Sequence, residues 1–170
     1  MSEISLNSIS EQELTKLLQM AEGHFCDLKS VEISPAKLTR TISAFSNSEG
    51  GELFIGIDED SETGTRTWRG FETPEAANGY IQAFEEFFPL GTDYSYDFLN
   101  NDSAPGYILK VQVSKTRDIK HASNGKVYIR RGAQNLPIKD KEKIEILKRD
   151  KGLVSFETEP VNCDLTNITN

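Results

Sequence analysis

Three acidic residues stand where two predicted strands would bring them together. Glu22 and Asp27 are five residues apart in the stretch EGHFCDLKS, and Asp58 follows the apolar run GELFIGI. If the strand around Asp27 pairs with the strand before Asp58, the three carboxylates meet at one point. Mg²⁺ and Mn²⁺ prefer carboxylate ligands, and such ions activate water and neutralise the leaving oxygen in phosphodiester cleavage. The spacing therefore predicts a metal site formed by Glu22, Asp27 and Asp58.

Lys29 completes this candidate site. It lies two residues after Asp27 and therefore on the same face of the predicted strand. Its ammonium group would stabilise negative charge that develops on a phosphate. The carboxylates also have simpler explanations, because a glutamate at a helix end often has no role and Asp58 opens an acidic stretch typical of turns.

The order of helical and strand patterns predicts an α+β (mixed α/β) fold, with a mixed sheet flanked by helices. Ser10 with Glu13 forms the capping-box pattern of a helix start, and Ser34-Pro35 begins a second helix that Gly50-Gly51 ends. The predicted strands are 25–31, 52–58, 94–99, 106–114 and 126–131, and two further helices are predicted at 74–88 and 140–149.

Length and composition predict one domain over residues 1–151. The chain has 170 residues, of which 36% are apolar, and this is enough for one core. We expect residues 152–170 to be a linker or the start of a truncated C-terminal region. The sequence lacks a long apolar run, a secretory signal and a CxxC pair, so we expect a cytoplasmic protein without a membrane segment. It also lacks a GxxxxGK[ST] motif, so ATP is not an expected cofactor.

The charge of the chain is unevenly distributed. Residues 115–151 contain twelve Lys and Arg against five Asp and Glu, whereas the other residues contain seven against twenty-two. A basic face on an acidic chain predicts contact with a phosphate backbone. The candidate nucleic-acid-binding residues are Lys120, Lys126, Arg130 and Arg131. Two alternatives stay open: the arginines pair with the acidic turn after residue 58, or the 139–151 segment is simply a solvated helix.

Four sequence blocks resemble the Schlafen AlbA_2 domain family, whose label as a divergent AAA-4 or ATP-binding domain is also in use. The resemblance covers about residues 11–145. Its blocks are E22…D27-L28-K29, AFSNSEGGELFIGIDED, the glycine at position 70, and K126-V-Y-I-R-R-G132. Members of this family usually begin a longer multidomain chain, so the resemblance implies a fused C-terminal domain.

In the catalytic branch of this family, three carboxylates form a metal-dependent RNA-cleaving site. Carried over by position, these are Glu22, Asp27 and Asp58, with Lys29 beside them. Asp27 stands where the family usually has glutamate, which retracts the carboxylate by about 1.5 Å, and Gly23 replaces a frequent serine. The resemblance implies a nuclease that uses Mg²⁺ or Mn²⁺ on RNA such as tRNA, in prokaryotic antiviral defence.

Two other classes of function remain open beside the nuclease. The chain can instead be a non-catalytic nucleic-acid-binding module that positions a fused regulator or effector. It can also be a protein-interaction or assembly domain, including a homo-oligomer, which the acidic first half favours.

Overall fold

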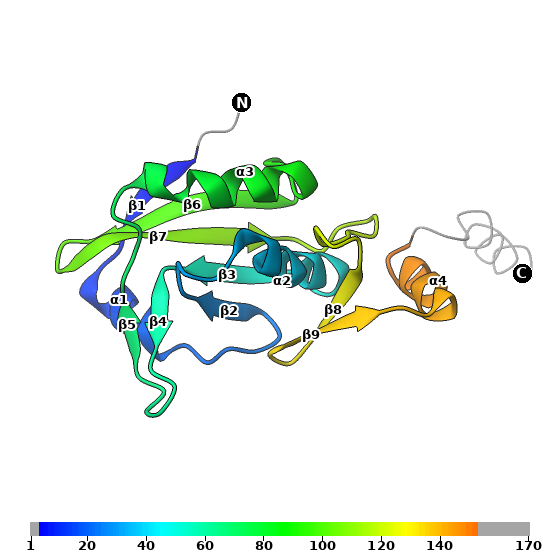
Figure 1. Ribbon diagram of the computed structural model, residues 1–170, viewed down its shortest axis with the longest axis horizontal. Helices are drawn as coiled ribbons and strands as arrows, with labels where there is room; N and C mark the ends of the chain where they lie inside the picture. Colours follow the sequence, from blue (N-terminus) through cyan, green and yellow to red (C-terminus); the bar gives the residue numbers. More distant parts are fainter. Residues whose placement is uncertain (1–3, 153–170) are drawn as a thin grey trace, which may run out of the picture.

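A five-stranded mixed sheet forms the centre of the computed structural model, which describes residues 4–152 (Figure 1). The strand order is β1-β6-β7-β3-β2. β1 is parallel to β6 and β2 is parallel to β3, whereas β7 runs antiparallel to both β6 and β3. The strands are β1 (Ser5–Ser8), β2 (Cys26–Lys29), β3 (Gly51–Ile55), β6 (Tyr94–Asn101) and β7 (Ala104–Val113). The predicted mixed α/β fold is confirmed.

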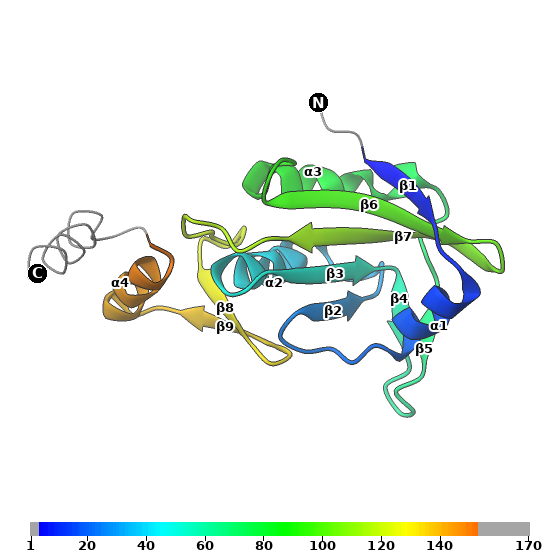
Figure 2. The ribbon, with the colours of Figure 1, turned by 180° about the vertical axis from the view of Figure 1, so that it is seen from behind.

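Helices cover both faces of this sheet (Figures 1 and 2). α2 (Pro35–Asn47) and α3 (Asn78–Phe87) lie on one face, where their apolar side chains form the larger core with β3, β6 and β7. α1 (Glu11–Gln19) lies on the other face beside the hairpin of β4 (Ile57–Glu59) and β5 (Arg66–Trp68). The core on that second face consists of Leu17, Leu28, Phe54, Ile57, Trp68, Leu99 and Ile108.

The helix boundaries follow local signals in the sequence. Ser10 and Glu13 form the predicted capping box of α1, and the Ser34 side chain accepts from the Lys37 amide at the start of α2. After α2, Gly50 adopts a φ of +81°, a conformation that residues with a side chain rarely reach. The helix predicted at 74–88 begins with a 3₁₀ turn, Pro74–Ala77, before α3.

The strand predicted at 52–58 is divided in two, which corrects the sequence prediction. Gly56 interrupts it with a φ of +124°, and a Cβ added there would lie 2.7 Å from Ile108 Cδ1. The Gly56 amide still donates to the Lys29 carbonyl at 2.7 Å, so the interruption lies directly at the end of β2. Beyond Gly56 the chain leaves the central sheet and forms β4, which pairs only with β5 among the described strands.

A second hairpin and a helix follow the central sheet. β8 (Val127–Arg131) and β9 (Gln134–Ile138) form the hairpin, and α4 (Lys141–Asp150) follows it at the edge of the molecule (Figures 1 and 2). β8 lies against α2, where the Asn47 amide donates to the Tyr128 carbonyl at 2.9 Å. No helix within residues 4–152 is long and apolar enough to cross a bilayer. The predicted linker or truncated region, residues 152–170, lies outside the described residues except for Gly152.

Candidate functional site

Two of the three predicted carboxylates converge on one ammonium group. Lys29 Nζ lies 2.5 Å from Asp27 Oδ1 and 3.4 Å from Glu22 Oε1. The alternation of β2 places Asp27 and Lys29 on one face, as predicted. Glu22 reaches this point from the preceding turn because its Oε1 also accepts from the Leu28 amide at 3.1 Å. Glu22, Asp27 and Lys29 thus form a real cluster at the edge of the central sheet.

The second oxygen of Asp27 faces α2 and the β8–β9 hairpin. Asp27 Oδ2 lies 3.4 Å from Thr41 Oγ1 and 3.4 Å from Arg130 Nη1. Asp27 and Arg130 are each only 2% exposed. Asn135 links the same elements, since it accepts from Arg130 Nη1 at 2.7 Å and donates to Thr41 Oγ1 at 2.9 Å. Both carboxylate oxygens of Asp27 therefore contact donors from neighbouring side chains.

Every nitrogen of the Arg130 guanidinium is engaged within the fold. Nε and Nη2 donate to the Gly23 carbonyl at 3.0 and 2.8 Å, and Nη2 also donates to the Cys26 carbonyl at 3.0 Å. The guanidinium also lies 4.9 Å from the centre of the Phe45 ring, as a cation–π contact. A planar group with five donors suits this task better than lysine would. Arg130 fastens the hairpin to the turn before β2.

The cluster is electrically compensated. Two carboxylates, Glu22 and Asp27, face two cations, Lys29 and Arg130. Burying charges is costly unless each has a partner and its remaining hydrogen-bonding capacity is satisfied, and Asp27 meets this condition. A divalent ion is most strongly attracted to uncompensated carboxylates, so binding one here would require the Lys29 ammonium to move aside.

Asp58 lies apart from this cluster. It belongs to β4, where it pairs with Thr67, and its Oδ2 lies 3.6 Å from Arg69 Nη1. Its other oxygen is buried and has no hydrogen-bond partner within the described part of the chain. β2 and β3 do pair as predicted, but the interruption at Gly56 redirects the chain before Asp58. Within residues 4–152, no group of three or more His, Cys, Asp or Glu is placed to hold a metal ion.

The four predicted nucleic-acid-binding residues fall into different environments. Arg130 is buried in the cluster described above, whereas its neighbour Arg131 is exposed on the opposite face of β8. Lys126 is also exposed. Lys120 is half-buried and its Nζ lies 3.1 Å from Asp118 Oδ2. Of the four, Arg131 and Lys126 form no ion pair with any described residue and offer the most accessible charge.

Two residues of the cluster were missed from the sequence. Thr41 lies within the predicted second helix, where no local pattern marks it as a site residue. Asn135 lies in β9, which is not among the predicted strands. Pro137, the fourth of the five residues of β9, argues against a strand, because proline cannot donate to a ladder. The pattern YIRRGAQNLPI, two short runs around a glycine, is the signal that would have indicated a hairpin.

The nearby thiol is not a nucleophile at neutral pH. Burial, and then the negative charges of Glu52, Asp27 and Glu22, raise the pKa of Cys26 to about 11. Its sulfur also contacts the sulfur of Met20 at 2.9 Å. Since the thiolate is the reactive form, Cys26 stays protonated and packs as a small apolar residue.

The fold is similar to that of several solved structures, including the two that follow. The N-terminal domain of a RecG-related protein from Nitrosomonas europaea has a TM-score of 0.52 at 17% identity, covering 76% of this chain and 90% of that one. The DIP2311 protein from Corynebacterium diphtheriae has a TM-score of 0.50 at 17% identity, covering 79% of this chain and 30% of that one. At this identity the likeness concerns the fold, a mixed α/β domain that occurs within longer chains.

The family itself is defined by sequence. The Schlafen, AlbA_2 family matches residues 22–139, and the chain belongs to this family. The matched range contains the whole Glu22–Asp27–Lys29–Arg130 cluster and Asp58. No curated protein matches the chain. Family membership supports a nucleic-acid-related function.

Proposed function

We propose that this chain is a nucleic-acid-binding domain, with RNA as the favoured ligand, that contacts phosphates through exposed cations of its C-terminal part. The observation that carries the proposal is the opposite orientation of two adjacent arginines. β8 directs Arg130 into the fold and Arg131 outward. The inner arginine fixes the hairpin, so the outer one is presented from a rigid strand.

Other exposed cations lie near Arg131. Lys143 of α4 lines the same groove as Arg131. Lys139 is exposed between β9 and α4, and Lys141 is exposed at the first position of α4. Phosphate contacts of this type give affinity without sequence specificity and make binding strongly dependent on salt. The remaining, acidic part of the chain would repel the backbone and thereby orient it on this basic surface.

Binding to a labelled single-stranded RNA at several salt concentrations tests this proposal. We expect Arg131→Ala and Lys143→Ala each to weaken binding and to reduce the slope of log K against log salt by about 0.7. Lys16→Ala is the matched control, since Lys16 is an exposed lysine of α1 on the other side of the sheet. Equal loss in all three variants would contradict a localised site, and absence of binding at low salt would favour the interaction-domain alternative.

A second candidate is the metal-dependent nuclease, and one observation favours it. Glu22 and Asp27 already hold a cation, the Lys29 ammonium, between them. Mg²⁺ or Mn²⁺ taking that place would use Glu22 and Asp27 as ligands and release Lys29 toward a phosphate. Asp58 would join only if the chain beyond Gly56 moved. A role in antiviral defence belongs to this candidate and comes from the family alone.

Cleavage of labelled tRNA and single-stranded DNA with Mn²⁺, Mg²⁺ or EDTA separates the two candidates. A nuclease predicts metal-dependent cleavage that is lost in Glu22→Gln and in Asp58→Ala. Cleavage lost in Glu22→Gln but kept in Asp58→Ala would indicate a site of two carboxylates. RNA binding without cleavage under every condition would leave the binding domain as the function.

A further inference from the structure

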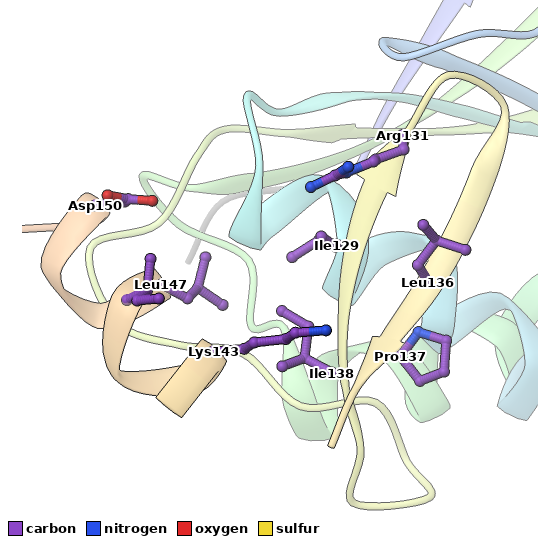
Figure 3. Close-up of a pocket in the computed structure, with 9 residues that line it drawn as sticks. Ile129, Arg131, Leu136, Pro137, Ile138, Lys143, Leu147 and Asp150 are labelled. Atoms are coloured by element: carbon purple, nitrogen blue, oxygen red, sulfur yellow. The ribbon is translucent and has the colours of Figure 1, made fainter. Parts of the chain in front are cut away.

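A groove with exposed apolar walls separates the β8–β9 hairpin from α4. Its volume is about 420 Å³, and Figure 3 shows the side chains that line it from both elements. Ile146 and Leu136 are 53% and 36% exposed, and they are two of the four large apolar side chains that are exposed within residues 4–152. Apolar surface gathered in one groove is typical of a docking site.

α4 is stabilised by little packing of its own. None of its ten residues is buried, although Ile146 and Leu147 line the groove. A helix of this length is marginal in water unless an apolar face packs against something. A further segment seated in the groove would supply that packing.

We propose that the segment directly after α4, residues 153–156 (LVSF), docks in this groove. The end of α4 points to this occupant. Gly152 has a φ of +76° and its amide donates to the Arg149 carbonyl at 3.0 Å, as in a Schellman motif. In that motif the residue after the glycine commonly packs against the last turn of the helix. Here that residue is Leu153, and the last turn offers Leu147, which lines the groove.

The point where the chain leaves α4 is fixed. Lys151 Nζ donates to the Ser46 carbonyl at 3.0 Å, to Asn47 Oδ1 at 2.7 Å and to Thr116 Oγ1 at 2.9 Å. Phe156 follows Gly152 by four residues and can therefore lie no more than about 14 Å from it. The segment starts at the groove and is too short to reach far beyond it.

Charge favours the same occupant. The groove carries Arg131 and Lys143 among its apolar side chains, with Asp150 at its α4 end. The sequence after Gly152 contains Glu157, Glu159 and Asp164 and no Lys or Arg. An apolar segment followed by acidic residues complements an apolar groove that also carries cations. The docking does not depend on the nucleic-acid-binding function proposed above.

Methyl NMR of the full chain, labelled at isoleucine δ1 methyl groups, tests the docking without nucleic acid. If Phe156 occupies the groove, Phe156→Ala removes a ring current, and the Ile138 and Ile146 methyl resonances shift. The Ile42 and Ile55 methyls, buried in the main core, stay in place. Val161→Ala, which shortens an apolar side chain beyond Glu159, is the control and leaves all four resonances unchanged.

Two results would overturn the proposal. The first is that the Ile138 and Ile146 methyl resonances have the same positions in wild type and in Phe156→Ala. The second is a Phe156-dependent shift that disappears on about tenfold dilution, because an intramolecular contact does not depend on protein concentration. That second result would assign the groove to another copy of the chain. A shift that persists on dilution supports docking of residues 153–156.

Discussion

Two buried cations hold the C-terminal part of the chain to α2, and they do so by different chemistry. Arg130 lies beside the carboxylate of Asp27, with a cation–π contact to Phe45. Lys151 lies at the end of α2 against neutral oxygens of Ser46, Asn47 and Thr116. A buried cation beside a carboxylate regains part of the free energy lost on leaving water, whereas a buried cation among neutral acceptors regains less of it. Burial lowers the pKa of Lys151, so the contact at Lys151 should depend on pH.

The largest expected effect on stability is at the contact between Arg130 and Asp27. Arg130→Ala leaves Asp27 as a buried carboxylate without its guanidinium and should lower the free energy of unfolding by about 3–5 kcal/mol. Urea denaturation followed by circular dichroism measures this difference. Arg131→Ala, at the neighbouring exposed position, is the control and should change stability by no more than about 0.5 kcal/mol. Similar losses in both variants would contradict the distinction between the two arginines.

The contact at Lys151 should make the free energy of unfolding depend on pH. Burial lowers the pKa of Lys151 to about 8, below the value of about 10.4 of a free lysine. The unfolded chain therefore binds more protons above pH 8, and the free energy of unfolding should rise with pH by up to about 1.4 kcal/mol per unit.

Comparison of wild type with Lys151→Met between pH 8 and 9 isolates this contribution. The raised pKa of Cys26 acts in the opposite direction when the unfolded thiol ionises, but it is common to both proteins. We expect the rise to be absent in the variant. A pH dependence that is the same in both proteins would mean that Lys151 keeps an ordinary pKa.

The exposed cations should affect binding and leave stability unchanged. Lys126→Ala combined with Arg131→Ala removes two charges that form no ion pair with described residues, so the folded state loses little. If both residues contact phosphate, the slope of log K for RNA binding against log salt should decrease in magnitude by about 1.4. A fall of half that size would assign contact to one of them, and an unchanged slope would place the RNA elsewhere on the chain.

The smallest effect is expected at Asp58. Its partner Arg69 is a half-exposed arginine that also pairs with Glu32, and such surface pairs contribute about 0–1 kcal/mol. Asp58→Asn should therefore change the urea midpoint only slightly. Asp27→Asn, at the buried carboxylate, should cost several times more. An equal cost at the two positions would show that Asp58 belongs to a buried network after all.

Local signals were sufficient to predict much of the fold. Ser10, Ser34 and Gly50 mark helix ends by interactions within a few residues, and the apolar run before Asp58 marks a strand. β1 was not predictable in this way, since SLNS has one large apolar residue and all four of its residues are exposed. Gly56 weakens the predicted strand because it has no side chain to pack, but the sequence does not show that the strand leaves the sheet there.

The sequence was sufficient to predict only those residues of the site that lie close together in the chain. Glu22, Asp27 and Lys29 lie within eight residues, and the period of a strand was enough to group Asp27 with Lys29. The partner of Asp27 lies 103 residues away, and no local pattern distinguishes Arg130 from Arg131. Alternation along β8 separates the two arginines, but which face is buried depends on how the hairpin packs on α2.

The parallel pairing of β1 with β6 has a consequence for how the protein forms during synthesis. Ser5 of β1 lies opposite Asp97 of β6, so 92 further residues must be synthesised after Ser5 before β1 can begin to pair with β6. At the usual pace of a ribosome this is a delay of roughly 5–20 s. During that time β2, α2 and β3, which are close in sequence, can already assemble. β1 therefore cannot join the sheet until β6 has been made, although α1, β2, α2 and β3 all lie between the two strands in the chain.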